Sequence, residues 1–203
     1  MIKVTSVKKM FGENVTAVED LSFQINKGEI VGFVGQNGAG KTTTIKMLTG
    51  ILNSTSGEIY INGFNIEKET LKAKQSIGYI ADNPDMFLQL TGLEFINFLA
   101  DIYGVSTEER IKRIKELTER FEVTEVLNSP MNDYSHGTRQ KFMVIAALVH
   151  NPPVWILDEP MTGLDPRAAF ELKNMMREHA DSGNCVFFST HVLEVAEKLC
   201  DKI

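Results

Sequence analysis

The sequence predicts an α/β fold in which the core carries a small antiparallel β subdomain and an inserted all-helical subdomain. Short β-rich runs fill the first part of the chain, helical patterns fill the middle, and apolar runs typical of a buried parallel sheet return afterwards. At 203 residues the chain suits one such domain, since two domains of ordinary size would be crowded. We therefore expect a single domain over 1–203, with the α/β core and β subdomain in 1–84 and 151–203 and the helical insert in 85–150.

The expected strands are short runs rich in branched and aromatic residues. Asn26-Lys27-Gly28 and Asn62-Gly63 are turn signals between them, because Asn and Gly accept the backbone angles of tight turns. These turns predict a partly antiparallel sheet. The runs expected to form strands are 2–7, 21–25, 30–34, 58–61, 77–80, 154–157 and 185–189.

The middle of the chain carries helix start signals. Thr91-x-x-Glu94 and Ser106-x-x-Glu109 both have the spacing of a capping box, in which the first and fourth residues satisfy each other's free backbone N–H groups. Apolar residues then recur at helical spacing. This spacing places Ile111, Ile114, Leu117 and Phe121 on one face of a helix.

The segment 35–42 matches the Gly-x4-Gly-Lys-[Ser/Thr] pattern of a phosphate-binding loop, between an apolar run and a helix expected to start near Lys41. Glycines let successive backbone N–H groups surround phosphate oxygens, and the following helix directs its positive end at the same anion. The alternative to a phosphate-binding loop is a Gly-rich turn with a solvated lysine and no binding role. In the phosphate-binding interpretation, Lys41 reaches the β- and γ-phosphates and Thr42 offers its hydroxyl to Mg²⁺. The predicted nucleotide-binding residues of this loop are Gly35, Asn37, Gly38, Ala39, Gly40, Lys41, Thr42 and Thr43.

An apolar strand at 154–157 ends in two acids, Asp158 and Glu159. A P-loop ATPase uses this arrangement to place one carboxylate beside Mg²⁺ and another beside water. Asp158 would then hold the metal and Glu159 would polarise the attacking water. Taken alone, the two acids are equally compatible with capping the next turn. Together with the phosphate loop they predict a P-loop NTPase core.

Composition narrows the classes of partner. The net charge of −6 and the pI near 5.3 argue against a large nucleic-acid-binding face, because nucleic-acid backbones are held by clustered Lys and Arg. Cys185 and Cys200 have no metal spacing, which favours reduced cytosolic thiols, and the histidines form no zinc motif. No run approaches the roughly 20 apolar residues that span a bilayer, so we expect a chain that is soluble or held to a membrane by another protein.

The segment Tyr134-Ser135-His136-Gly137-Thr138 precedes an apolar helical stretch. With the phosphate loop and the paired acids, it makes the whole chain resemble the nucleotide-binding subunit of ATP-binding-cassette (ABC) transporters. The signature of that family is Leu-Ser-Gly-Gly-Gln at a helix start, which Ser135 and Gly137 match and the other three residues do not. In the family two subunits pair head to tail, and the signature of one touches the γ-phosphate held by the other. The resemblance assigns Ser135, His136 and Gly137 to this contact.

Other family elements follow in the expected order. Thr162-Gly163-Leu164-Asp165 resembles the D-loop, which implies that Asp165 lies at the dimer interface. His191 resembles the switch histidine that contacts the γ-phosphate and completes the catalytic site with Glu159. Phe11 matches the aromatic residue that stacks on adenine. The alternatives are a histidine that merely lies beside a helix N-cap and a phenylalanine of the core.

Two positions depart from the family pattern. The family usually carries a glutamine where this chain has Asp82, whose carboxylate either approaches Mg²⁺, directly or through water, or is a turn residue before Pro84. His136 replaces a signature glycine, and its imidazole either donates to phosphate or points aside. Since backbone N–H groups do not depend on the side chain, we expect activity to be retained with an altered rate. The chain also ends where family members continue, so we expect a C-terminally truncated domain.

The resemblance implies an Mg²⁺-dependent ATPase that forms a homodimer, or a heterodimer with a second ABC ATPase subunit, on two ATP molecules. It would drive a separate integral membrane permease from the cytoplasmic face of the cell membrane, and its motifs resemble the bacterial export-type branch. Two alternatives stay open: a soluble ABC ATPase, as in iron-sulfur assembly, and a module that binds ATP without hydrolysing it. The transported substrate is determined largely by the permease.

The family's permease contact lies near the glutamine loop and the helical insert, which corresponds to 82–103 here. Aromatic residues at helical spacing usually belong to a core, so we expect Phe95, Phe98 and Tyr103 to pack inside the insert. The residues expected to face the permease are Met86, Phe87 and Leu88.

Overall fold

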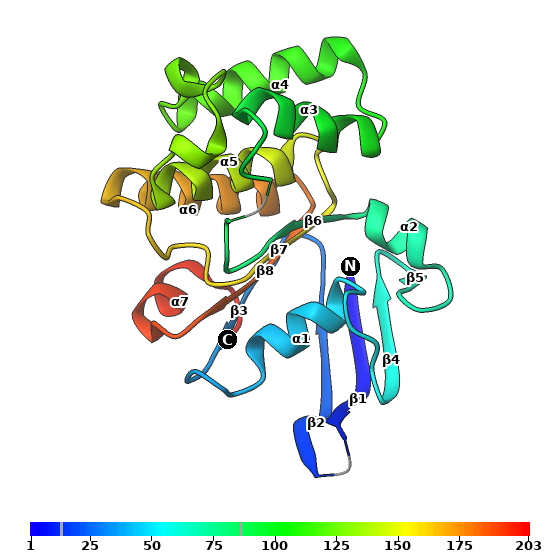
Figure 1. Ribbon diagram of the computed structural model, residues 1–203. Helices are drawn as coiled ribbons and strands as arrows, with labels where there is room; N and C mark the ends of the chain where they lie inside the picture. The colour runs from blue at the N-terminus through cyan, green and yellow to red at the C-terminus, as the bar shows by residue number, and fades with distance from the viewer. Residues whose placement is uncertain (13, 86) are drawn as a thin grey trace. The chain divides into compact units, whose positions relative to one another are not determined.

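A computed structural model describes residues 1–12, 14–85 and 87–203 (Figure 1). The chain forms two compact units. The core unit contains Met1–Tyr79, Pro152–Glu159 and Met176–Ile203, and the helical unit contains Ile80–Asn151 and Pro160–Met175. The α/β fold class expected from the sequence is confirmed, and the division into a single domain with an insert at 85–150 stays a prediction.

An antiparallel sheet occupies one part of the core unit. Its strands, in spatial order, are β2 (Val15–Ile25), β1 (Ile2–Phe11), β4 (Ser56–Ile61) and β5 (Phe64–Asn65). The two-residue turn between β4 and β5 is Asn62-Gly63, and both residues have positive φ angles, 52° and 91°. Asn and Gly tolerate this backbone conformation, which matches the twist of a tight hairpin. The predicted turn is therefore confirmed.

A second sheet carries the segments on which the site is built. Its order is β3 (Ile30–Val34), β8 (Cys185–Thr190), β7 (Val154–Leu157) and β6 (Ile77–Ile80), drawn side by side in Figure 1. The β3–β8 and β7–β8 pairs are parallel. Every residue of β7 and β8 is buried, which explains their continuous apolar sequence. All runs expected to form strands lie within strands.

The core of this unit joins both sheets to α1 (Lys41–Leu48). The ring of Phe23 from β2 stacks on Phe187 from β8, with centroids 5.6 Å apart. Ile45 and Leu48 of α1 are fully buried in the same cluster. Because α1 follows the phosphate loop directly, this packing fixes the loop to a rigid core. The remaining helices of the core unit are α2 (Thr70–Gln75), the last turns of α6 (Pro166–Asp181) and α7 (Leu193–Leu199).

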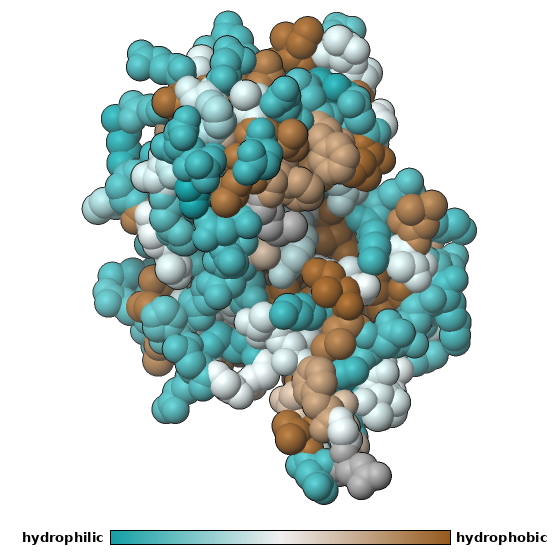
Figure 2. Space-filling model, in the orientation of Figure 1, coloured by the Kyte–Doolittle hydropathy of each residue, from teal (hydrophilic) through white to brown (hydrophobic). Residues whose placement is uncertain are grey.

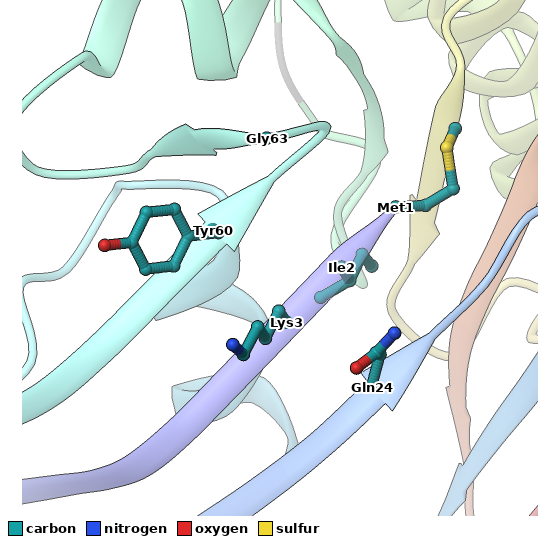
Figure 3. A pocket seen from close by; sticks show the side chains of 6 residues that line it. All are labelled: Met1, Ile2, Lys3, Gln24, Tyr60 and Gly63. Atoms are coloured by element: carbon teal, nitrogen blue, oxygen red, sulfur yellow. The ribbon is translucent and has the colours of Figure 1, made fainter.

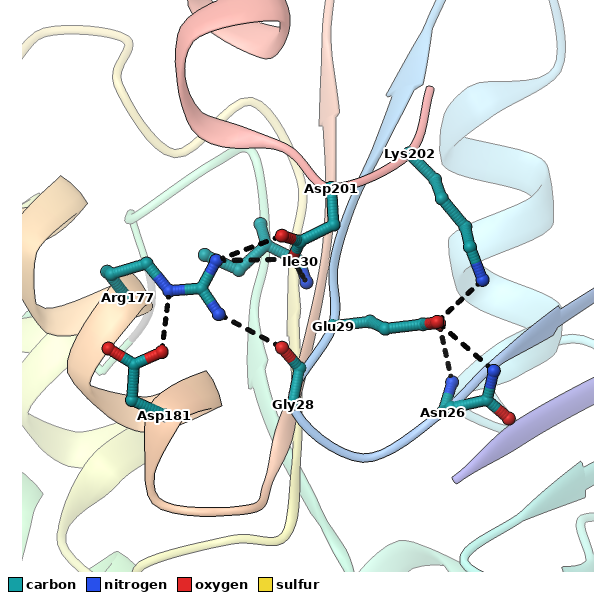
Figure 4. A network of polar contacts seen from close by, with 8 residues as sticks. All are labelled: Asn26, Gly28, Glu29, Ile30, Arg177, Asp181, Asp201 and Lys202. Carbon is teal, nitrogen blue, oxygen red and sulfur yellow. Dashed lines mark hydrogen bonds and ion pairs between the residues drawn. The ribbon is translucent and has the colours of Figure 1, made fainter.

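Polar contacts fasten residues 201–202 beside β3 (Figure 4). The Arg177 guanidinium donates to the Gly28 carbonyl at 2.9 Å and to the Asp201 carboxylate at 3.1 Å. Asp201 also accepts from the backbone N–H of Ile30 at 2.7 Å. These charge-assisted bonds hold the start of β3, and β3 leads into the phosphate loop.

Glu29 belongs to the same network. Burial on its own raises the pKa of this carboxyl, but hydrogen bonds from Asn26 and the Lys202 ammonium at 2.6 Å outweigh it and lower the pKa to about 2. The ionised form is thus the one that the folded chain stabilises.

The helical unit contains α3 (Gly92–Ile102), α4 (Thr107–Arg120), α5 (His136–Leu148) and the first part of α6. Two short 3₁₀ turns, η1 (Thr124–Val126) and η2 (Met131–Asp133), precede α5. The capping box before α3 is confirmed: Thr91 Oγ1 accepts from the N–H of Glu94 at 3.2 Å, and Glu94 accepts from the N–H of Thr91 at 2.8 Å. At α4, Ser106 makes the serine half of the predicted box by accepting from the Glu109 N–H at 3.3 Å.

The four apolar residues at helical spacing along α4 differ in burial. Ile114, Leu117 and Phe121 are buried, but Ile111 is 64% exposed. At about 100° per residue, Ile111 points roughly 90° away from the mean direction of the other three side chains. It therefore falls outside the apolar stripe of the helix.

Candidate functional site

The phosphate loop connects β3 to α1 in a conformation that requires glycine. Gly38 and Gly40 have φ angles of 84° and 86°, which L side chains rarely adopt. A Cβ on Gly40 would lie only 2.6 Å from the Ala17 carbonyl oxygen, so this glycine also permits the loop to approach β2. Gly40 is the N-cap of α1 and offers no side-chain cap, and no acid lies in the first turn. The free N–H groups and the positive end of the helix suit an anion.

Lys41 is held close to the loop that it follows. Only 7% of the residue is exposed, and its ammonium donates to the carbonyls of Gly35 at 2.7 Å and Gln36 at 3.2 Å. It also lies 3.5 Å from Glu159 Oε1. The other predicted loop residues lie nearer the surface: Asn37, Ala39 and Thr42 are exposed, and Thr43 is half-buried.

The two acids follow β7. Asp158 is fully buried, and its Oδ1 accepts a hydrogen bond from Ser189 Oγ at 2.5 Å. Within the described part of the chain, its Oδ2 is buried and has no hydrogen-bond partner. A buried carboxylate oxygen is costly unless a cation or a donor meets it. This oxygen therefore fits the predicted metal contact.

Glu159 lies between two basic side chains. Its Oε2 is 2.9 Å from His191 Nδ1, and its Oε1 faces the Lys41 ammonium. The side chain is 14% exposed, whereas that of His191 is 55% exposed. The backbone of Glu159 is in the left-handed region, with φ 47°, an uncommon conformation for a non-glycine residue. Strain of this kind concentrates at functional sites.

Ser189 is a site residue that the sequence motifs did not reveal. Its hydroxyl donates to Asp158 and accepts from the backbone N–H of Glu159 at 3.0 Å. It is fully buried at the end of β8, two residues before His191. The only signal in the sequence is a hydroxyl residue near the end of an apolar strand. The core unit therefore brings Lys41 and both acids together with residues at the end of β8.

The signature segment forms the start of α5 in the helical unit. Ser135 is exposed and caps its own helix, since its Oγ accepts from the Thr138 N–H at 3.2 Å. The ring of His136 lies on Gly163 of the D-loop, where a Cβ would be 2.2 Å from Cδ2 and 2.8 Å from Nε2. A Cβ on Gly137 would be 2.6 Å from the Gly163 carbonyl oxygen. Signature and D-loop are thus packed in direct contact.

Asp165 fastens the D-loop to the same helix. It accepts from the Ala168 N–H at 2.9 Å and pairs with the Lys141 ammonium at 3.0 Å. First the backbone bond and then the Lys141 contact lower the pKa of this carboxyl. The ionised aspartate therefore links the first turn of α6 to the second turn of α5.

Phe11 and Asp82 are the remaining predicted site residues. Phe11 ends β1 and is 44% exposed, with the Lys9 ammonium 5.2 Å from its ring centroid. Asp82 is exposed in a bend of the helical unit. The adenine-stacking role of Phe11 and the metal role of Asp82 both stay predictions.

Two cavities lined by described residues lie outside the phosphate site. One, of about 320 Å³, is open on the antiparallel sheet, where Lys3, Gln24 and Tyr60 project from neighbouring strands (Figure 3). The other, of about 240 Å³, lies beside Asp165 in the helical unit, between paired charges such as Arg167 and Glu122. Neither cavity has a lining residue from the phosphate loop or the paired acids.

A phosphate loop after β3, paired acids after β7 and a helix start that suits an anion define a nucleotide-binding P-loop ATPase. Residues 18–162 match the ABC transporter family. The chain belongs to this family, as an ATP-binding domain with the ATPase fold.

Two curated relatives from Bacillus subtilis (strain 168) illustrate the match. The chain is 36% identical over 203 residues to the linearmycin resistance ATP-binding protein LnrL, with all of this chain and 65% of the relative covered. It is 33% identical over 207 residues to the ABC transporter ATP-binding protein NatA, with all of this chain and 84% of the relative covered. The chain thus spans just under two thirds of LnrL.

Solved structures agree. An ATP-binding subunit of an ABC transporter superposes with a TM-score of 0.94 at 34% identity, covering 98% of this chain and 83% of that one. The dimeric ATP-binding cassette MJ0796, in a post-hydrolysis state with ADP and phosphate, superposes with a TM-score of 0.86 at 28% identity, covering 97% and 90%. Among residues 1–12, 14–85 and 87–203, no helix has the length and apolarity needed to cross a membrane.

Proposed function

We propose that this chain hydrolyses Mg²⁺-ATP as one half of a head-to-tail dimer, at the cytoplasmic face of the cell membrane, and so powers transport through a separate permease. One observation carries the proposal. Lys41, Glu159 and His191 lie in a single chain of contacts, beside a buried aspartate oxygen that has no hydrogen-bond partner among the described residues. A binding module that does not hydrolyse ATP has no need of this arrangement.

The residues present fit a magnesium ion. Mg²⁺ usually takes one or two carboxylates together with substrate phosphates and water rather than an all-protein cage. In the described residues no group of three or more His, Cys, Asp or Glu side chains forms such a cage. Asp158 Oδ2 and the exposed hydroxyl of Thr42 would hold the metal, which when bound neutralises charge on the phosphates.

Glu159 has the surroundings of a general base. Its Oε1 lies 3.5 Å from the Lys41 ammonium and its Oε2 lies 2.9 Å from His191 Nδ1, so the carboxylate is held in an orientation from which it can accept a proton from water. His191 orients the carboxylate through Nδ1. Lys41 and the N–H groups of the loop supply the positive potential for the β- and γ-phosphates.

The dimer is supported by the exposed start of α5. Ser135 and His136 are exposed, and the free N–H groups at a helix start attract an anion. The relative MJ0796 is described as a dimeric cassette. We propose that Ser135, His136 and Gly137 meet the ATP held by a second subunit, identical or related, and that Asp165 positions the D-loop at the same interface.

Apolar side chains on the helical unit supply a surface for the permease (Figure 2). Phe87 is 42% exposed and Leu88 is half-buried, as the proposed contact requires, while Met86 lies outside the described residues. Phe95 is buried as expected, but Phe98 is 43% exposed, so its assignment to the core is wrong. Its ring extends the exposed patch, with its centroid 5.7 Å from that of Phe87.

Export is the direction that we propose. LnrL is named for resistance to linearmycin, and a transporter confers resistance most simply by removing the toxic compound. The membrane protein that copurifies with this chain would identify the permease and the class of substrate.

Replacement of Glu159 with Gln tests the proposal. Loss of a general base typically lowers turnover by about 10²- to 10⁴-fold. The variant should therefore bind ATP, hydrolyse it slowly and accumulate as an ATP-bound dimer in size-exclusion chromatography. The matched control is Glu116→Gln, which makes the same change on an exposed face of α4. Unchanged turnover and no ATP-dependent dimer in Glu159→Gln would favour a module that only binds ATP.

A further inference from the structure

Ser189 occupies a position set by strand register. The parallel pairing of β7 with β8 places Leu157 opposite Phe188. Asp158 and Ser189 are the next residues along the two strands, so they lie beside each other just past the last paired residues. Ser189 is fully buried, so its hydroxyl can bond only to the groups that surround it.

That hydroxyl makes a contact with each acid. It donates its proton to Asp158 Oδ1 at 2.5 Å and accepts the backbone N–H of Glu159 at 3.0 Å. The first bond removes the rotational freedom of the Asp158 carboxylate, which leaves Oδ2 as the buried oxygen without a hydrogen-bond partner among the described residues. The second bond holds the amide of Glu159 at the point where φ is 47°.

We propose that Ser189 is a positioning residue that presents Asp158 Oδ2 to the metal and holds the backbone of Glu159 in the conformation that aims its side chain at water. The inference rests on the proposed function. A polar neighbour that orients a metal ligand typically contributes about 10- to 100-fold to metal affinity or activity. A single buried hydroxyl thereby couples the geometry of the two acids.

Binding of a fluorescent ATP analogue, measured in EDTA and in Mg²⁺, separates this role from general structural damage. For each variant we would measure the dissociation constant in EDTA divided by that in Mg²⁺, which reports how much the metal tightens binding. The second measurement is the Mg²⁺ concentration that gives half-maximal turnover. We expect Ser189→Ala to reduce the ratio and to raise that Mg²⁺ concentration by about tenfold. Its kcat should fall by about 10- to 100-fold, with a smaller change in KM.

Two further variants accompany Ser189→Ala, one as a control and one as a conservative substitution. Thr190→Val deletes the hydroxyl of the neighbouring residue, which is also buried on β8, and should leave the ratio unchanged. Ser189→Cys keeps a weak donor and should fall between wild type and Ser189→Ala, and it replaces the alanine variant if that chain does not fold.

Asp158→Ala separates the metal site from the role of Ser189. If this variant retains the Mg²⁺-dependent increase in affinity, the metal assignment in the proposed function fails. If Asp158→Ala abolishes the increase while Ser189→Ala and Ser189→Cys keep it at the wild-type level, only the role of Ser189 is overturned.

Discussion

The phosphate site of the core unit and the signature and D-loop of the helical unit are built in different ways. In the core unit the decisive groups are buried polar side chains with specific partners: Lys41 pairs with Glu159, and Asp158 accepts from Ser189. In the helical unit the signature is exposed, and its contact with the D-loop is steric, the His136 ring resting on Gly163. Side-chain chemistry dominates at the paired acids, and steric fit dominates where the signature meets the D-loop.

This difference explains where the sequence departs from the family pattern. The phosphate loop and paired acids match the pattern, whereas the signature keeps only Ser135 and Gly137 of five residues. Backbone N–H groups at a helix start are present whatever side chains surround them. Substitutions there therefore have little effect on anion binding unless the new side chain causes a steric clash. Buried charged groups have no such tolerance, because an unpaired partner costs several kcal/mol.

Among the substitutions that compare the two units, the largest effect is expected from Gly40→Ala in the core unit. The new Cβ would meet the Ala17 carbonyl oxygen at 2.6 Å, and φ is 86°. The clash and the backbone strain together cost about 2–3 kcal/mol, equivalent to roughly 30- to 150-fold weaker ATP binding, of which the strain alone is about 1 kcal/mol. Gly38→Ala is the control, because φ is 84° but nothing lies within 4 Å of the new Cβ. Equal losses in a titration with a fluorescent ATP analogue would show that the contact with β2 is unimportant.

A smaller effect is expected on the pH dependence of the free energy of unfolding, and it also arises in the core unit. Burial lowers the pKa of His179 to about 4 from an ordinary 6.5, although a bond to the Pro152 carbonyl opposes the shift. The neutral imidazole is thus favoured by folding, so its contribution is complete above pH 6.5 and is lost as pH falls toward 4. Between pH 7 and 4.5 the loss should be about 2–3 kcal/mol.

Urea unfolding followed by Trp155 fluorescence measures this loss, since Trp155 is the single tryptophan and its ring packs edge-on against His179 with centroids 5.5 Å apart. Carboxyl groups also titrate in this range, so the comparison is with His179→Gln. That variant should lose about 2 kcal/mol less than wild type over the same interval. An identical pH slope in the two proteins would contradict the assignment.

Most of the fold follows from local sequence. Apolar runs identified the strands of the parallel sheet, and Asn62-Gly63 identified a hairpin turn. The first half of β2 was not predicted, because residues 15–20 are exposed or half-buried and pair with β1 over several register shifts, so they form no buried apolar run. The exposure of Ile111 was also not predicted, because its spacing is helical but its direction lies outside the buried stripe.

The site was predictable to the extent that its residues are neighbours in sequence. The phosphate loop and paired acids are continuous motifs, so their residue types were sufficient. Ser189 and the left-handed backbone of Glu159 depend on the register of β7 and β8, which joins residues about 30 positions apart and leaves no motif. The contact of His136 with Gly163 likewise arises only when α5 and the D-loop have folded together.

The smallest effect is expected in the helical unit, where a double-mutant cycle tests whether the contact is steric. Gly163→Ala places a Cβ 2.2 Å from His136 Cδ2 at a residue whose φ is 76°. His136→Gly removes the ring, so it should relieve the clash but not the backbone strain, which is about 1 kcal/mol. We expect a coupling of about 1 kcal/mol between the two substitutions, measured as ATP-dependent dimerisation in a Glu159→Gln background. His136→Gly alone should change turnover by less than about tenfold, because the ring packs on the D-loop while the N–H groups of α5 remain. Strictly additive losses would mean that His136 acts on the nucleotide directly, and the signature would then depend on side-chain chemistry as the core unit does.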